Sequence, residues 1–359
     1  MNANDARHRR VVQAAWDDYD GRDVAELQEL SAMVSTNRVY RLVLADGEQV
    51  IAKSSNYGSF FMFAEDHERL HEVNKLLVGG PFEHFMADVL TRDGRPYLWY
   101  DGEMWVAFYA SIELADPLPR QLSDGQVAQL AREIGRFHNA CGAIAPELPA
   151  PSKTAKSDAV NLYERLGSRN AGEVFGLDQS RIDLVRRHTH RFLMAILDAG
   201  FDQWPKIPVL IDWNLGNFSV RFGGDGGNDG NDGGSDFHLF SRWDYDWFRL
   251  ESRLLDFYFL SRVSSTTGDR SVWTYGSHTL LEPRFRQFLH AYHQVAPLTE
   301  AEILFLKEAY RFFLLNYVVR EGRHFFRYEF WQHLMHDAVD VQLPAIDDLD
   351  LTPLLAILD

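Results

Sequence analysis

Two short acidic segments near the middle of the chain carry the residue types that phosphoryl transfer needs. Asp212 precedes Asn217 on the segment 209–220, which has β-rich residues at both ends, and Asp244 and Asp246 follow a second apolar run. In phosphoryl transfer one carboxylate accepts the proton of the attacking hydroxyl, while an amide oxygen and a second carboxylate hold Mg²⁺ against the nucleotide phosphates. The two segments therefore indicate a kinase.

Each segment also has a simpler interpretation. Asp, Asn and Gly populate turns for conformational reasons alone, so Asp212 and Asn217 could form an ordinary turn. Asp244 and Asp246 could be the solvent-facing end of a strand. Their aromatic neighbours Trp243 and Tyr245 favour a partly buried setting, in which unpaired acids are costly without a cation. The kinase interpretation therefore depends on whether other features occur in the right order.

A lysine and a glutamate-rich helix supply those features. Lys53 closes an apolar strand and can reach the α- and β-phosphates of a nucleotide, although a snorkelling edge lysine would look the same. The helix expected over residues 60–77 offers Glu65, Glu68 and Glu72 to pair with that lysine. Glu68 and Glu72 share one helix face, so their spacing leaves both open. We favour Glu72 from its position near the end of the helix.

The periodicity of the sequence divides the chain into a sheet-rich part and a helical part. Alternation and turn residues predict strands at 37–44, 49–53, 86–90, 97–100 and 105–109, with a helix over 11–30 before them. Capping-box spacing at Ser123 and Thr299 starts two of the expected later helices, at 127–141, 159–166, 179–199, 299–320 and 347–359. The glycine-rich segment 223–236 is expected to be the loop of a hairpin.

Composition restricts the class of protein. The 359 residues are enough for two lobes around a cleft. The formal charge of −16, from 36 basic and 52 acidic residues, argues against nucleic-acid or anionic-lipid partners. The single Cys141 excludes an internal disulfide framework, and no apolar run approaches the ~20 residues of a membrane span. We therefore expect a soluble, cytoplasmic protein that does not bind membranes.

The order of these features resembles the aminoglycoside phosphotransferase and choline kinase family, the small-molecule branch of the protein-kinase-like fold. Residues 212–217 resemble the catalytic loop of that family, and residues 243–246 its metal-binding segment. Residues 132–138 are similar to a helix that carries a Leu-Gly-x-Phe-His motif in members of the family. The resemblance spans nearly the whole chain.

This resemblance implies an α+β, two-lobed fold. A small N-terminal antiparallel-sheet lobe over residues 1–109 would bind the nucleotide. A larger, mainly helical C-terminal lobe over residues 110–359 would carry catalysis and acceptor binding. The implied reaction is ATP-dependent phosphorylation of a hydroxyl on a small molecule such as an aminoglycoside, an amino alcohol or a sugar. The acidic charge of the chain favours an amine-bearing acceptor.

The family also implies roles for individual residues. Asp212 would be the catalytic base, and Asn217 and Asp244 would hold Mg²⁺. The nucleotide, ATP, would be bound by a set that the family places on the N-terminal lobe and the connector after it. That set comprises Lys53 with Glu72 or Glu68, Ser35 and Thr36 of the nucleotide-loop hairpin, and the connector near Phe108, Tyr109 and Ser111.

Two departures from the family pattern support an alternative function. Leu210 stands where the family usually has a histidine that braces the catalytic loop, and the hairpin loop 31–37 contains no glycine. Backbone amides without glycine approach phosphates less freely. Both departures favour a catalytically degraded, nucleotide-binding regulatory protein of the same fold as the alternative. His138, on the apolar face of its helix, is expected to be a packed, hydrogen-bonded core residue.

Overall fold

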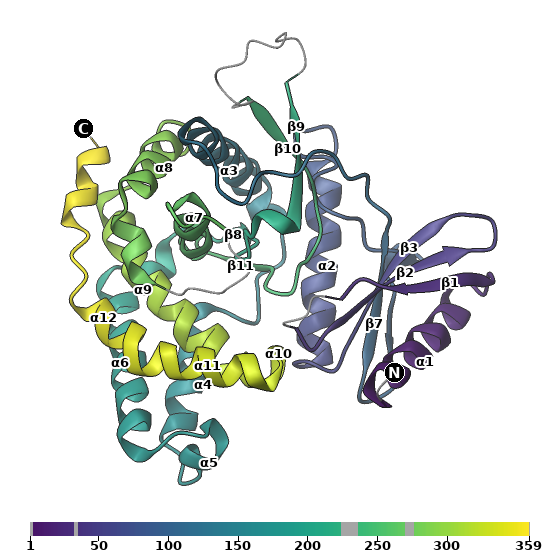
Figure 1. Cartoon of the computed structure of the whole chain (residues 1–359), viewed down its shortest axis with the longest axis horizontal. Helices are drawn as coiled ribbons and strands as arrows, with labels where there is room; N and C mark the ends of the chain where they lie inside the picture. The colour runs from purple at the N-terminus through teal and green to yellow at the C-terminus, as the bar shows by residue number, and fades with distance from the viewer. Residues whose placement is uncertain (1–2, 32–34, 224–235, 270–275, 359) are drawn as a thin grey trace.

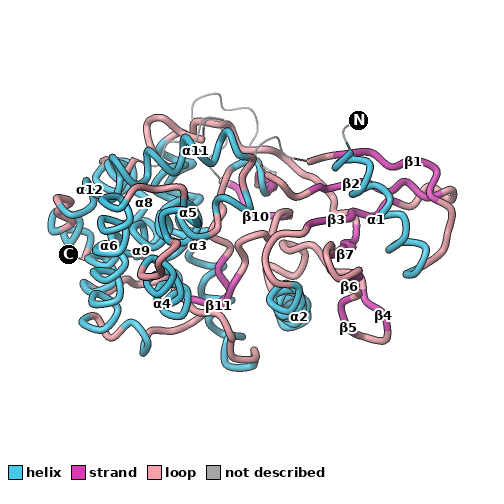
Figure 2. The backbone as a smooth tube through the Cα atoms, turned by 90° about the horizontal axis from the view of Figure 1, so that it is seen from below, coloured by secondary structure: helices cyan, strands magenta, loops and turns pink. Residues whose placement is uncertain are grey.

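The computed structural model describes residues 3–31, 35–223, 236–269 and 276–358 and consists of two lobes. Figure 1 shows a small lobe built on an antiparallel sheet beside a larger lobe made mostly of helices, and Figure 2 shows the strands and helices concentrated at opposite ends of the molecule. The expected fold class, a two-lobed α+β protein-kinase-like fold, is confirmed.

The small lobe contains a five-stranded antiparallel sheet with the order β1-β2-β3-β7-β6. Its strands are β1 (Val24–Glu29), β2 (Arg38–Leu44), β3 (Gln49–Ser55), β7 (Trp105–Ala110) and β6 (Leu98–Tyr100). A separate pair of two-residue strands, β4 (Thr91–Arg92) and β5 (Arg95–Pro96), forms a hairpin beyond the sheet. The register of the central strands places Lys53 opposite Ala107.

Alternate residues of β2 serve the two faces of the sheet. Tyr40 and Leu42 are buried against the helix α1 (Ala3–Tyr19), whose Trp16 is fully buried in the same apolar cluster. The opposite side chains, Val39 and Arg41, face the cleft between the lobes. The helix α2 (Phe60–Leu77) packs between the sheet and the larger lobe (Figure 1). Period-two alternation thus produces one core face and one ligand-facing face.

Two of the expected elements in this lobe are wrong. The helix expected over 11–30 ends at Tyr19, because Gly21 adopts a left-handed φ of 78° and donates to the Trp16 carbonyl, after which β1 begins. The strand expected at 86–90 forms only single bridges, in which Met86 pairs with Arg242 and Val89 pairs with Tyr109. Hence β1, at the sheet edge, completes the five strands.

The larger lobe is helical, and its helices and strands have the following bounds. The α-helices are α3 (Asp124–Ile144), α4 (Ala155–Leu166), α5 (Ala171–Phe175), α6 (Gln179–Asp198), α7 (Phe257–Ser264), α8 (Pro283–His293), α9 (Glu300–Phe313), α10 (Gly322–Phe325), α11 (Tyr328–Asp337) and α12 (Leu343–Asp347). The 3₁₀-helices are η1 (Ala145–Glu147), η2 (Phe201–Gln203), η3 (Leu215–Asn217), η4 (Arg253–Asp256), η5 (Ser277–Leu281) and η8 (Thr352–Ile357), and η6 (Leu314–Arg320) and η7 (Ala338–Gln342) are π-helices. Its strands are β8 (Ile207–Val209), β9 (Phe218–Phe222), β10 (Phe237–Arg242) and β11 (Arg249–Glu251).

Helix ends in this lobe follow the sequence signals. Both expected capping boxes are present, since Ser123 and Thr299 each accept from the backbone three residues on. The long aromatic helix expected to end at Arg320 changes from α to π at Leu314. The expected terminal helix is represented by the 3₁₀-helix η8. Beyond Gly223, the loop expected at 223–236 lies largely outside the described residues, but β9 and β10 on either side form the expected hairpin.

None of the helices in the described ranges combines the length and the apolarity needed to cross a membrane.

Candidate functional site

A cavity of about 390 Å³ lies between the lobes and brings together side chains from distant parts of the sequence. Val39 and Ile51 of the sheet line one side, and the connector after β7 lines the edge. Five of the sequence-predicted site residues line this cavity together. They are Lys53, Tyr109, Ser111, Asn217 and Asp244. Apolar walls with a few convergent polar groups are typical of small-molecule sites.

Two residues with left-handed backbones shape the loops that carry Asp212 and Asp244. Ile211 has a φ of 61° and Asp244 has a φ of 74°. Among the residues that the structure describes, Asp93 is the one other non-glycine residue with a positive φ. A β-branched residue adopts this conformation only where its surroundings hold it there, and such strain concentrates at functional sites. Both loops therefore need a brace.

Arg242 provides one brace by joining the two loops. Its side chain is fully buried at the end of β10, and its Nη2 donates to the Asp212 carbonyl at 2.7 Å and to the Asp244 carbonyl at 3.2 Å. The guanidinium lies 5.2 Å from the ring centroid of Trp213. The Trp243 amide donates to the Asn217 carbonyl at 3.0 Å. The two loops are thus fixed relative to one another by their backbones.

Asp256 provides the second brace, at the residue before the predicted base. Its Oδ1 accepts from the Ile211 amide at 2.6 Å, and its Oδ2 lies 2.9 Å from Nε2 of His138. Nδ1 of His138 lies 2.7 Å from the Tyr292 hydroxyl. His138 is therefore the packed, hydrogen-bonded residue that its sequence position predicts, and it also orients Asp256. This arrangement holds the loop although Leu210 occupies the position of the family histidine.

Asp212 has an environment suited to a proton acceptor. Burial raises its pKa to about 7, and the neighbouring Asp244 carboxylate adds to that rise. Arg242 and Arg262 oppose the shift. A carboxylate with a pKa near neutral pH can both accept a proton during reaction and release it afterwards.

Lys53 pairs with carboxylates of the larger lobe. Its ammonium contacts Asp246 directly and lies 3.5 Å from Oδ1 of Asp244. Burial alone would lower the pKa of Lys53, but the two carboxylates raise it above its ordinary value, so the lysine stays charged. Nδ2 of Asn37 donates to Oδ2 of Asp246 at 2.9 Å, and Ser55 donates to Asn37. A polar chain from the sheet therefore fixes Asp246 beside the lysine.

The expected pairing of Lys53 with a glutamate of α2 is wrong. Glu72 is bonded to Lys75 one helical turn away at 2.9 Å, and Glu68 is exposed. The α2 residue beside Lys53 is instead His67, whose Nδ1–H donates to the Phe63 carbonyl at 2.8 Å. Burial lowers the pKa of His67 to about 3, so it is neutral and cannot replace the missing carboxylate. Asp246, two residues after Asp244, takes that place.

Tyr109 connects α2 to the cavity. Its hydroxyl donates to Nε2 of His67 at 2.5 Å, and its ring stacks on Tyr245 with centroids 6.3 Å apart. These contacts hold the Tyr109 ring against the cavity. The family resemblance placed Tyr109 on the connector beside the nucleotide, whereas no sequence signal identified His67.

Three other residues expected at the nucleotide do not face this cavity. Ser35 is buried and bonds to the Asn37 amide, and Thr36 bonds to the carbonyls of His324 and Phe325 in α10. Phe108 points to the α1 side of the sheet, and its carbonyl accepts from Leu90. The hairpin loop therefore uses its polar groups to contact the larger lobe, because the two lobes meet there.

Asn217 and Asp244 fit a Mg²⁺ ion in donor type. An amide oxygen and a carboxylate face one cavity, and hard cations prefer oxygen ligands. Lys53 and the backbone amide of Asp246 outweigh the effect of burial and hold the pKa of Asp244 below its usual range, so it is ionised and can accept a cation. Within the described ranges no group of three or more His, Cys, Asp or Glu residues could hold a metal by itself.

Removing the Asp256 brace should destabilise the protein. The substitution Asp256→Ala leaves the buried Ile211 amide and His138 without their acceptor, and we expect a loss of roughly 2–4 kcal/mol in the free energy of unfolding. His138→Ala should cost less, and the two losses should not add in the double variant. Chemical denaturation measures all three. Additive losses would contradict the brace, and Asp198→Ala, at an exposed helix end, is the matched control.

Asp212 should make the stability of the free protein depend on pH. Its pKa is about 7 in the folded state against an ordinary value of 3.8, so between these values the folded state binds a proton that the unfolded state lacks. Stability conferred by the neutral carboxyl is therefore lost as the pH rises through this window. The asparagine in the variant Asp212→Asn does not titrate, so the variant does not lose this stability. The free energy of unfolding of the variant minus that of wild type should therefore increase by roughly 1–3 kcal/mol as the pH is raised from 5 to 8.

This comparison is made by denaturation without Mg²⁺ or nucleotide, with Asp198→Asn as the control for removal of one carboxylate. An unchanged difference between Asp212→Asn and wild type across the two pH values would show that Asp212 has an ordinary pKa.

Comparison with known proteins extends only to solved structures. No family model matches the chain, and no curated protein matches it. Among solved structures, an amicoumacin kinase in complex with AMP-PNP, Ca²⁺ and Ami is 12% identical, covers 98% of each chain and has a TM-score of 0.61. A microcompartment-associated aminopropanol kinase is 16% identical, with 95% of this chain and 100% of the other covered and a TM-score of 0.59.

A spectinomycin phosphotransferase in complex with ADP and spectinomycin is 12% identical, with 95% of this chain and 98% of the other covered and a TM-score of 0.52. Identities at this level establish the fold and leave the roles of individual residues to the geometry of this chain. The chain has the protein-kinase-like fold of small-molecule kinases and phosphotransferases, and its resemblance to the aminoglycoside phosphotransferase and choline kinase family is confirmed at the level of that fold.

Proposed function

We propose that this protein is an ATP-dependent kinase that phosphorylates a hydroxyl of a small molecule such as an aminoglycoside, an amino alcohol or a sugar. The observation that carries the proposal is the tie through Arg242, which joins the loop of Asp212 to that of Asp244. Asp244 lines the cavity with Lys53 and Asn217, and Asp212 lies behind that wall. The fold that the chain shares with known small-molecule kinases supports it.

Each residue has a part in the proposed reaction. The Asp212 carboxylate accepts the proton of the attacking hydroxyl, whose oxygen bonds to the γ-phosphorus as the bond to the β,γ-bridging oxygen breaks and ADP leaves. The Lys53 ammonium binds phosphate oxygens. Asn217 and Asp244 would hold Mg²⁺, which neutralises charge on the phosphates when bound. Val39, Ile51 and the connector after β7 provide apolar walls for the base.

The alternative function is a nucleotide-binding regulatory protein. The absence of an α2 carboxylate beside Lys53 and the leucine at position 210 favour it. Against it, Asp246 replaces the carboxylate, and Arg242 and Asp256 brace the catalytic loop from other directions. We therefore propose an active enzyme, located in the cytoplasm.

The substitution Asp212→Ala tests the assignment of the base. We expect phosphoryl transfer to fall by at least about a thousandfold, because the proton acceptor is lost while the nucleotide cavity stays intact. ADP release is measured over a panel of hydroxyl-bearing acceptors, and Mg²⁺-ATP binding is measured by thermal shift, which at 100 times the dissociation constant corresponds to about 2.7 kcal/mol.

Retained transfer in Asp212→Ala would show that another group is the base. Binding of Mg²⁺-ATP without transfer by wild type to any acceptor would favour the regulatory function instead.

A paired substitution tests which carboxylate supports Lys53. Asp246→Ala should lower kcat/KM for ATP by at least about tenfold, because it removes the carboxylate in direct contact with the ammonium. Glu72→Ala is the matched control and should leave kcat/KM within about twofold, since Glu72 pairs with Lys75 on the surface. The opposite ranking of the two variants would restore the glutamate of α2 as the partner of Lys53.

A further inference from the structure

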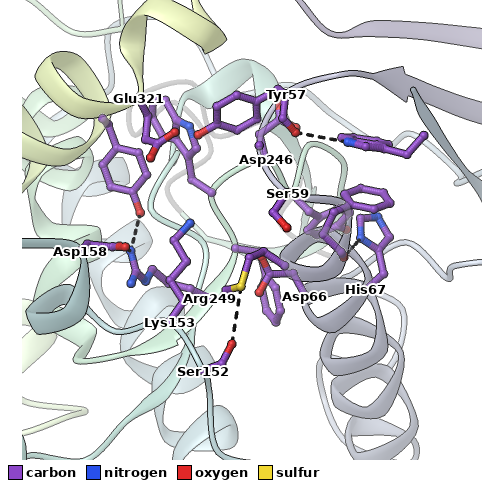
Figure 3. A pocket seen from close by; sticks show the side chains of 18 of the residues that line it. Tyr57, Ser59, Asp66, His67, Ser152, Lys153, Asp158, Asp246, Arg249 and Glu321 are labelled. Atoms are coloured by element: carbon purple, nitrogen blue, oxygen red, sulfur yellow. Dashed lines mark hydrogen bonds and ion pairs between the residues drawn. The ribbon is translucent and has the colours of Figure 1, made fainter. Parts of the chain in front are cut away.

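A second cavity, of about 510 Å³, lies on the other side of Lys53 from the nucleotide cavity. The two cavities share the side chains of Lys53, Tyr109 and Tyr245 as a common wall. Figure 3 shows the second cavity between the cleft-facing side of α2 and residues of the larger lobe. None of the sequence-predicted catalytic or metal residues lines it, so phosphoryl transfer as proposed leaves it without a use.

The larger lobe gives this cavity a wall with two buried guanidiniums. Arg249 is 4% exposed, and its Nη1 donates to Oδ2 of Asp158 at 3.0 Å and to the Tyr317 hydroxyl at 3.2 Å. Its Nε and Nη2 have no hydrogen-bond partner among the described residues. Nη1 of Arg320 lies 2.8 Å from the other carboxylate oxygen of Asp158, and its Nη2 lies 2.9 Å from Oε1 of Glu321. One carboxylate is thus shared by two arginines, and the unpartnered Nε and Nη2 of Arg249 are themselves buried.

Lys153 adds a third positive charge to this wall. Figure 3 shows its side chain extending into the cavity between Arg249 and Asp66. Its ammonium makes no hydrogen bond or ion pair with any residue in the part of the chain that the structure describes. Burial lowers the pKa of Lys153, and Arg249 lowers it further. Asp158 and Glu321 are bonded to the two arginines, whereas Asp158 and Asp66 act on Lys153 from a distance without bonding to its ammonium.

The helix α2 provides the opposite, acidic wall. Asp66 faces the cavity, and its nearest cation among the described residues, Nη1 of Arg69, lies 3.4 Å from Oδ1. Burial raises the pKa of Asp66 to about 6 against the effect of Lys153 and Arg249, so the carboxyl is mostly ionised at neutral pH, and Arg69 donates its one hydrogen bond among the described residues. Met62, Phe63 and Trp247 line the space between the two walls. An unpaired ammonium such as that of Lys153 is costly in such a setting unless a ligand neutralises it.

We propose that this cavity is a second ligand site for a small zwitterion, with a carboxylate bound by Lys153 and an ammonium bound by Asp66. Such a ligand would give the Lys153 ammonium the bonded partner that it lacks and Asp66 a second one. Charge-assisted hydrogen bonds between an ammonium and a carboxylate are about twice as strong as those between neutral groups. The π-helix η6, which carries Tyr317 and Arg320 to the cavity, is a rare helical form that often marks functional sites.

A zwitterion could come from two sources. It could be the phosphate acceptor itself, in which case the assignment rests on the proposed function, or an effector that acts on nucleotide binding through the shared wall. Lys53 and its partner Asp246 line the cavity, so an occupant lies against the residues that hold the nucleotide phosphates in the proposed mechanism. Both sources require the same recognition chemistry.

Calorimetry with matched probes tests the site. The probes are serine and homoserine, each compared with the amino alcohol that lacks its carboxylate and the hydroxy acid that lacks its amine. For at least one series we expect the zwitterion to bind wild type at least tenfold more tightly than either partner, which is about 1.4 kcal/mol. Lys153→Gln should abolish this preference. Lys156→Gln is the control, because Lys156 pairs with Asp202 on the surface.

The site is overturned if neither zwitterion is preferred, or if Lys153→Gln binds them as wild type does. Thermal unfolding checks that the variants fold, and Lys153→Gln should unfold at or above the wild-type temperature because it removes an unpaired charge. Asp66→Asn should weaken binding of the zwitterion and the amino alcohol alike, and leave that of the hydroxy acid unchanged.

Enzyme assays then separate the two sources and the two proposals. ADP release with the zwitterion in wild type, absent in Asp212→Ala although the zwitterion still binds, identifies it as the acceptor. A change in KM for ATP without phosphorylation of the zwitterion identifies an effector. Zwitterion binding with no phosphoryl transfer to any acceptor would overturn the proposed kinase function and support the second ligand site. Transfer to aminoglycosides without zwitterion binding would support the kinase function and overturn the second ligand site.

Discussion

The ion pair between Lys53 and the carboxylates of Asp246 and Asp244 is the interaction on which the working parts of this structure depend. It joins the central strand of the small lobe to a loop of the large lobe, and both cavities of the cleft have Lys53 in their walls. A buried pair of this kind contributes little net stability, because desolvation offsets attraction. Its effect is geometric, since an ammonium with two fixed partners has one position.

The loops on the other side of that ion pair are held in strained conformations by buried polar groups. Ile211 and Asp244 keep left-handed backbones only because Asp256 and Arg242 bind the surrounding amide and carbonyls. The same burial that makes these bonds strong raises the pKa of Asp212. Rigid placement and proton affinity therefore have one cause, a desolvated setting at the centre of the cleft.

The chain places carboxylates differently from the pattern that its sequence resembles. The partner of the strand lysine comes from residue 246 instead of a helical glutamate, so α2 is free to present neutral His67 to Tyr109 and Asp66 to the second cavity. Position along the sequence does not decide which of two acidic side chains contacts a lysine, because successive side chains of a helix point in directions about 100° apart around its axis. Rotation of α2 by that amount exchanges Glu68 for His67.

Local sequence determined the type of most segments, and tertiary structure decided which side chains meet. The strands β2, β3 and β7, the helix α2, both capping boxes and the order of Lys53, Asp212 and Asp244 follow from periodicity, turn chemistry and spacing. The strand β1, the partner of Lys53, the docking of Thr36 on α10 and the unpaired charge of Lys153 do not follow from them. Periodicity reports which face of an element is buried, whereas pairing and charge balance depend on residues that only the folded chain brings into contact.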